Sequence, residues 1–182
     1  MKKRKFNSIF LLFFIICNSI DNSNNNINNV KDVDDLCLES DEVTGWNIVG
    51  KDCKVFAKED LYGHIDGGDG LYLENGLTEY LLYNMADSLK SRVEIFACNM
   101  ATSKNSSTLF NLAKDDLTDS LNLENYEDST AIIGIFGIGT VYELHAKLGC
   151  YYFKLTFQNI ENSSKAVEVS ETFLNAFQTK IK

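Results

Sequence analysis

Seven short segments of the chain are predicted to be β-strands, and in Leu77–Met85 and Arg92–Met100 apolar and polar residues alternate with the period of two that is typical of a strand with one buried face. In the fourth segment, Val93, Ile95 and Ala97 would point to one side of a strand, and Glu94 and Phe96 to the other. The predicted strands are Trp46–Val49, Cys53–Ala57, Leu77–Met85, Arg92–Met100, Thr130–Phe136, Thr140–Ala146 and Cys150–Gln158.

Three other segments repeat apolar residues every three or four positions, which is the period of an amphipathic helix. The predicted helices are Glu59–Leu77, Ser106–Leu121 and a final helix capped by Ser163 and Ser164. The buried stripe of the final helix would be Ala166, Val169/Ser170, Phe173, Phe177 and Ile181.

The elements therefore follow the approximate order ββαββαβββα. Gly50-Lys51-Asp52 and Lys147-Leu148-Gly149 are short enough to join neighbouring strands as hairpins. Short connections of this kind favour antiparallel pairing. We predict an α+β fold, with a mainly antiparallel sheet and helices packed on one of its faces.

The chain begins with a basic, an apolar and a polar stretch, in that order. Four basic residues at positions 2–5 precede Phe6–Ile16, whose apolar core IFLLFFII falls short of the roughly 20 residues of a bilayer-spanning helix. A basic start and a short apolar core are typical of a signal peptide. Cys17 follows, and residues 18–29 are rich in Asn and Ser, as flexible linkers are.

This arrangement resembles a bacterial lipoprotein precursor, in which Cys17 would carry the lipid. Such precursors have a small residue before the cysteine, where this chain has Ile16, so the alternative is cleavage into a soluble periplasmic or secreted form. We predict a signal peptide at 1–16, a lipidated Cys and flexible Asn/Ser-rich, acidic tether at 17–42, and a single domain at 43–182. The resemblance implies a protein exported and lipid-anchored at the cell membrane or outer membrane.

The charge of the chain excludes one class of partner. Of its 17 basic residues, four lie at positions 2–5, so the other 13 stand against 26 acidic residues and give a net charge of −13 without the predicted signal peptide. Proteins that bind nucleic acids need clustered Lys and Arg, and so do proteins that bind an anionic membrane through a basic patch. We therefore predict no nucleic-acid partner, and we attribute the acidity to solubility.

Four cysteines remain after Cys17: Cys37, Cys53, Cys98 and Cys150. In an oxidising compartment they could form up to two disulfides, in any of three connectivities, or remain as buried thiols. The chain contains no CxxC pair, so the sequence supports neither a thioredoxin-like motif nor a zinc ribbon.

The predicted helix Glu59–Leu77 is unusual because it contains five glycines, and each interior Gly costs roughly 0.5–1 kcal/mol relative to Ala. Gly68 continues the apolar stripe of Leu61, Ile65 and Tyr72, so we expect it to let the helix approach the sheet closely. Asn75-Gly76 would end the helix.

His64, Asp66 and Asp69 bring possible metal ligands into the same segment. At about 100° per residue, His64 and Asp66 would lie about 160° apart, whereas Asp66 and Asp69 would share one side. A good Ca²⁺ site needs six to eight oxygen ligands, so we predict no metal and expect Asp66 to bond the local backbone.

Other catalytic patterns are weak. Only His64 and His145 could serve as a histidine base, and there is no GxSxG elbow. The run Gly134–Thr140, GIFGIGT, has its glycines in the order GxxGxG and precedes a predicted strand, so it does not indicate a dinucleotide site. We predict no cofactor.

A longer pattern resembles a bacterial family of exported proteins that is known only as a domain of unknown function. The family signature is a Trp-containing strand followed by Leu-Tyr-x-x-Ile-(Asn/Asp)-Gly-Gly-Ala-x-x-Tyr-x-x-x-Gly-Phe. The matching residues are Trp46, Leu61, Tyr62, Ile65, Asp66, Gly67, Gly68, Tyr72 and Gly76. The later runs RVEIFACNM and GCYYFKLTF resemble two further strands of that family.

The resemblance spans about residues 43–181 and implies a fold and an exported location, with no catalytic residue. Asp69 departs from it, because the family has Ala there, and Leu77 replaces an aromatic residue. The predicted function is a membrane-tethered binding or assembly module of the cell envelope, whose partner is an unidentified envelope protein or ligand. The alternative is an envelope hydrolase or metal-dependent enzyme centred on Asp66 and Asp69.

Overall fold

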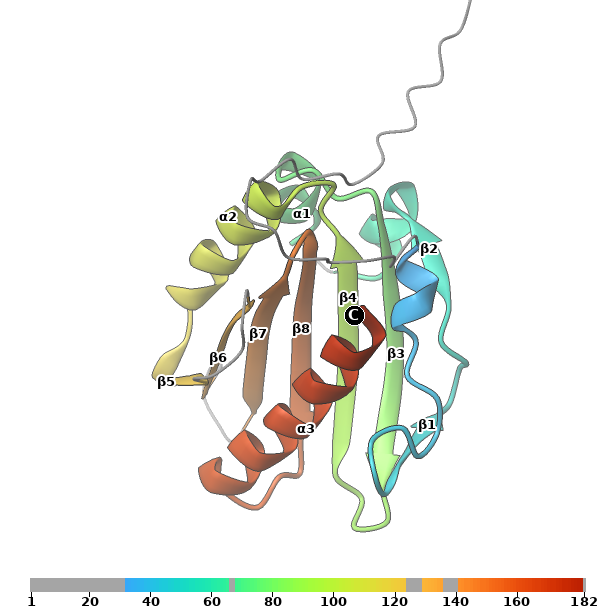
Figure 1. Cartoon of the computed structure of the whole chain (residues 1–182), viewed down its shortest axis with the longest axis vertical. Coiled ribbons are helices and arrows are strands. Elements are labelled where there is room, and N and C mark those ends of the chain that lie inside the picture. The colour runs from blue at the N-terminus through green and yellow to red at the C-terminus, as the bar shows by residue number, and fades with distance from the viewer. Residues whose placement is uncertain (1–31, 66–67, 124–128, 136–140, 182) are drawn as a thin grey trace, which may run out of the picture.

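The computed structural model of the chain describes residues 32–65, 68–123, 129–135 and 141–181. Within that part of the chain, eight strands form one antiparallel sheet in the order β1-β3-β4-β8-β7-β6-β5, with β2 also paired to β3 (Figure 1). The strands are β1 Trp46–Val49, β2 Val55–Ala57, β3 Glu79–Asp87, β4 Arg92–Asn99, β5 Thr118–Leu123, β6 Ser129–Ile135, β7 Tyr142–Leu148 and β8 Tyr151–Gln158. The predicted α+β class and antiparallel sheet are confirmed.

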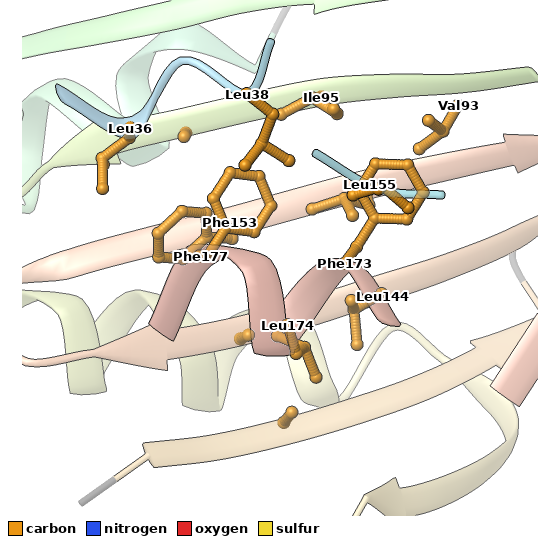
Figure 2. Close-up of a cluster of buried hydrophobic side chains, with 14 of the residues drawn as sticks. Leu36, Leu38, Val93, Ile95, Leu144, Phe153, Leu155, Phe173, Leu174 and Phe177 are labelled. Carbon is orange, nitrogen blue, oxygen red and sulfur yellow. The ribbon is translucent and has the colours of Figure 1, made fainter. Parts of the chain in front are cut away.

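The first face of the sheet is covered by the long helix α3, Ser163–Ile181. Asn162 caps this helix, because its Oδ1 accepts a hydrogen bond from the backbone N–H of Lys165 at 3.0 Å. The predicted stripe of α3 is buried as expected. Figure 2 shows its Phe177 beside Phe153 of β8, and its Phe173 beside Leu155 of the same strand.

The second face is covered by α2 (Ser103–Lys114), α1 (Asp69–Glu74) and the 3₁₀ helix η2 (Lys58–Gly63). Helices therefore lie on both faces, which differs from the predicted single helical face. The reason is that the central strands are apolar on both sides: Phe96 and Cys98 of β4 are buried opposite Val93 and Ile95.

Two connections also differ from the predictions. β1 and β2 do not form a hairpin; both pair with β3, since Val49 lies opposite Asn84 and Val55 opposite Leu81. The predicted helix to Leu121 ends at Lys114, and β5 follows and pairs with β6. An additional strand thus enters the order, which becomes ββαββαββββα.

The folded part begins earlier than the predicted boundary at residue 43. Val33, Leu36 and Leu38 are fully buried in the core under α3, and η1 (Val33–Leu36) carries the first two. Figure 2 shows Leu36 and Leu38 in this core. A disulfide joins Cys37 to Cys53. Cys98 and Cys150 are buried and take no part in that disulfide. The acidic segment after residue 32 therefore belongs to the domain, whereas the predicted signal peptide, Cys17 and most of the tether lie outside the described residues.

No helix in the described residues is both long and apolar enough to pass through a membrane.

Candidate functional site

The glycine-rich segment forms two short helices in place of the one that was predicted. η2 ends at Gly63 and α1 begins at Asp69, so the angular argument that separated His64 from Asp66 does not apply. The predicted inward residues are nevertheless inside: Leu61 and Tyr72 are buried and Ile65 is partly buried. Their burial explains the apolar spacing without a continuous helix.

Gly76 is the glycine of this segment that the backbone requires. Its φ is +84°, and a Cβ placed there would lie 2.4 Å from Asn105 Nδ2. The N–H groups of Gly76 and Leu77 donate to the carbonyls of Leu73 and Tyr72, which is a Schellman ending of α1. The predicted stop at Asn75-Gly76 is confirmed.

The expected role of Gly68 is wrong. A Cβ placed at Gly68 would have Ile65 Cγ2, at 3.2 Å, as its contact within 4 Å, and no sheet atom of the described residues comes that close. Gly68 instead occupies the position before α1. Asp66 and Gly67 lie outside the described residues.

The remaining candidates of this segment are separated. Asp69 is the first residue of α1, where a carboxylate suits the helix N-terminus. His64 Nδ1 lies 2.6 Å from Tyr80 Oη, and the His64 ring meets Phe56 edge-on. Burial, with the nearby Asp60 carboxylate, raises the pKa of Tyr80 to about 12, so its hydroxyl is neutral where it meets His64. Among the described residues, no three His, Cys, Asp or Glu side chains gather closely enough to hold a metal ion.

An open groove of about 450 Å³ lies between η2 and α1. Its walls include exposed apolar side chains: Tyr62 is 81% exposed and Leu73 is 41% exposed. Leu71 of α1, 38% exposed, lies outside the groove on the same short helix as Leu73. The groove and Leu71 together are called the η2–α1 surface below. The residues that line the groove are Lys58, Glu59, Tyr62, Leu73, Gly76, Leu77 and Thr78.

A second cluster, made of polar side chains, lies on the same face of the sheet, on β7 and β8. Glu143 is almost fully buried; its Oε1 is 2.9 Å from Lys154 Nζ and accepts from Thr156 Oγ1 at 3.3 Å. Its Oε2 is 3.2 Å from His145 Nε2, and His145 Nδ1 is 2.6 Å from Tyr152 Oη. We call these five residues the Glu143 network.

The carboxylate of Glu143 is ionised within this network. Burial raises its pKa, but the hydrogen bonds from His145 and Lys154 outweigh burial and hold the pKa below its usual value. An ionised carboxylate accepts only, so His145 Nε2 carries the proton that faces Glu143, while His145 Nδ1 lies within hydrogen-bond distance of the Tyr152 hydroxyl. Both nitrogens of the imidazole are engaged, so His145 presents no free base to a substrate.

The sequence indicated this network only in part. His145 was identified as a possible histidine base, but Glu143, Tyr152 and Lys154 were not singled out. The available signal was the strand period: Glu143 and His145 are two residues apart, and so are Tyr152 and Lys154. The register of β7 with β8, which places His145 opposite Lys154, could not be read from the pattern.

Two other features of the sequence, Trp46 and the GIFGIGT run, contribute to packing of the fold. Trp46 is buried on β1 and its ring meets Phe173 of α3 edge-on, with centroids 5.2 Å apart. Gly134 of GIFGIGT lies on β6, where a Cβ would come within 2.9 Å of the Thr118 carbonyl oxygen, so close strand packing requires a glycine there. Residues 136–140 of that run lie outside the described residues.

Comparisons with known proteins support the fold alone. No family model and no curated protein matches the chain. Among solved structures, the chain is similar to the extracellular domain of PknH from Mycobacterium tuberculosis, with 10% identity and a TM-score of 0.50. The match covers 81% of this chain and 95% of that one.

Proposed function

We propose that the protein is a membrane-tethered lipoprotein of the bacterial cell envelope, and that its domain is a binding or assembly module without catalytic activity. The η2–α1 surface is its contact site. The observation that carries this proposal is Tyr62, which belongs to the Leu-Tyr-x-x-Ile motif and is nevertheless 81% exposed beside an open groove. Packing explains Leu61 and Tyr72 of the same motif, but it does not explain Tyr62.

Two further observations support the proposal. The Glu143 network uses its hydrogen-bonding groups on one another, as a structural network does. The neighbour with a similar fold is described as an extracellular domain, which agrees with export of this chain. The resemblance to an exported bacterial family and the lipoprotein-like start agree with it as well.

Acyl labelling in bacteria that express the full chain tests the tether. We expect label in the wild-type protein and none in Cys17→Ser, because the lipid would be bound to that thiol. Ser19→Ala, which changes a neighbouring polar residue, should keep the label. An unlabelled wild-type protein would show instead that the chain is released as a soluble form.

The enzymatic alternative, centred on Asp66 and Asp69, has a separate test. Thermal unfolding of the full chain with and without Ca²⁺ or Zn²⁺ would show a raised midpoint if these carboxylates held a metal, because a ligand that binds only the folded state stabilises it. The binding-module proposal expects no change of midpoint. A rise that Asp69→Asn abolishes would favour the metal-dependent enzyme.

A further inference from the structure

We propose that the η2–α1 surface rests on the lipid surface of the membrane that carries the anchor. This inference rests on the proposed function, because it requires Cys17 to be held at a membrane. It adds which end of the domain faces the lipid and what that end contacts.

The first step is the place where the described chain begins. The backbone N–H of Val33 donates to Glu79 Oε1 at 3.3 Å. Glu79 starts β3, and the residue before it, Thr78, lines the groove. The chain that leads to Cys17 therefore enters the domain at the same end of the sheet as the η2–α1 surface.

The second step is the length of that chain. Only 14 residues lie between Cys17 and Asp32. Even fully extended, the 15 steps from Cys17 to Asp32 span at most about 50 Å, from roughly 3.3–3.6 Å per residue. An anchor at Cys17 thus keeps this end of the domain within that distance of the lipid.

The third step is the distribution of exposed apolar side chains. Among the described residues, six large hydrophobic side chains are exposed, and three of them, Tyr62, Leu71 and Leu73, belong to the η2–α1 surface. Figure 1 shows α1 at one end of the sheet and the β3–β4 hairpin, which carries Leu89, at the other. The apolar side chains are therefore concentrated at the end where the anchor would be.

The chemistry of the surface suits a lipid headgroup region of low charge. A tyrosine combines an apolar ring with a polar hydroxyl, and this residue type is enriched where membranes meet water. η2 and α1 carry four acidic residues, Glu59, Asp60, Asp69 and Glu74, against the single Lys58. An anionic lipid surface would repel them, so the contact should be stronger on a zwitterionic membrane.

An indole placed at position 62 tests the contact. Full-length lipidated protein carrying Tyr62→Trp is reconstituted into phosphatidylcholine vesicles with brominated acyl chains, which quench an indole that reaches them. Leu89→Trp is the matched control, since Leu89 is 82% exposed at the opposite end of the sheet. The native Trp46 is buried and gives the same background in both proteins.

We expect loss of emission and a blue shift for Tyr62→Trp and neither for Leu89→Trp. Added phosphatidylglycerol should reduce the loss, and Leu71→Ser with Leu73→Ser should abolish it. Equal emission from both variants on vesicles that carry the protein would overturn the inference while leaving the tether intact. So would a blue shift that needs an added envelope protein, because the occupant would then be that protein. Failure of the wild-type protein to float with vesicles would instead contradict the proposed tether.

Discussion

Glu143 holds a negative charge inside the domain because three neighbours donate to it. Lys154 and His145 are the charged and aromatic donors, and Thr156 adds a hydroxyl. A buried carboxylate without such partners would be protonated or would destabilise the fold. The network therefore stabilises the pairing of β7 with β8.

Replacement of Glu143 by Gln should destabilise the domain. Removing one member of a fully buried ion pair costs roughly 3–5 kcal/mol, but Lys154 is 29% exposed and can regain some water, so we expect a loss of about 1–3 kcal/mol. Urea unfolding measures the change. Glu94→Gln is the matched control, because Glu94 is exposed and shares Thr156 as its cross-strand neighbour; it should change stability by less than about 0.5 kcal/mol.

Glu143 should also make the free energy of unfolding decrease at acidic pH. The pKa of Glu143 is lower in the folded protein than its ordinary value of 4.5, so the unfolded chain binds a proton first as the pH falls. The stabilisation from Glu143 is complete above pH 4.5 and is lost as the pH falls through the folded value. The difference in unfolding free energy between wild type and Glu143→Gln should therefore narrow from pH 7 to pH 3. A constant difference would show that the Glu143 carboxylate is not stabilised by its ionisation.

Two buried helical serines should respond in opposite directions. Ser170 Oγ of α3 has no hydrogen-bond partner in the described residues, whereas Ser106 Oγ of α2 bonds the Gly149 carbonyl at 2.7 Å. Ser170→Ala should stabilise by about 0.5–1.5 kcal/mol, since it removes a desolvated hydroxyl and improves helix propensity. Ser106→Ala should destabilise by about 1–2 kcal/mol, because it leaves that carbonyl without its donor. Urea midpoints of both variants check the pair.

At the scale of elements, the sequence correctly predicted the helices and strands whose type follows from their own residue spacing. The strand β4 and the stripe of α3 were predicted correctly, because Val93, Ile95 and Ala97 lie on one face of β4 and the apolar residues of α3 keep the helical period. β5 was missed because Leu117 and Leu121 continue the spacing of α2, and only pairing with β6 makes that segment a strand. The helix over 59–77 was wrong because Leu61 and Tyr72 are buried from two separate helices.

The disulfide Cys37–Cys53 should be an important constraint on the segment that carries η1. It closes a loop of 16 residues, and loop closure of that length restricts the unfolded chain by about 3 kcal/mol. Reductant should lower the urea midpoint of the wild-type protein accordingly. The double variant Cys37→Ser/Cys53→Ser should already have the lower midpoint and be insensitive to reductant. An unchanged midpoint in reduced wild-type protein would contradict the prediction.

At the scale of the whole molecule, the start of the domain could not be predicted because the segment after residue 32 is acidic. The segment after residue 32 contains Asp34, Asp35 and Glu39, which are exposed, so its composition is that of a linker. Its apolar side chains Val33, Leu36 and Leu38 pack in the core with α3 and the sheet, which only the tertiary structure shows. Figure 2 shows Leu36 and Leu38 there. The two helical layers were not predicted for the same reason, because only the tertiary structure shows which face of the sheet each helix covers.

The domain boundary can therefore be tested by shortening the chain. A protein that begins at Asp32 should unfold cooperatively, whereas one that begins at Val43, with Cys53→Ser to avoid an unpaired thiol, should not. Loss of a buried leucine side chain costs about 2–5 kcal/mol, and the shorter chain lacks two buried leucines and Val33, so the sum approaches the 5–15 kcal/mol that a whole domain possesses. Leu36→Ala in the longer chain gives the graded version, with an expected loss of about 2–5 kcal/mol. A cooperative transition from the shorter chain at the same urea concentration would mean that η1 and Leu38 only cover the core, and that the sheet and α3 are sufficient to form it.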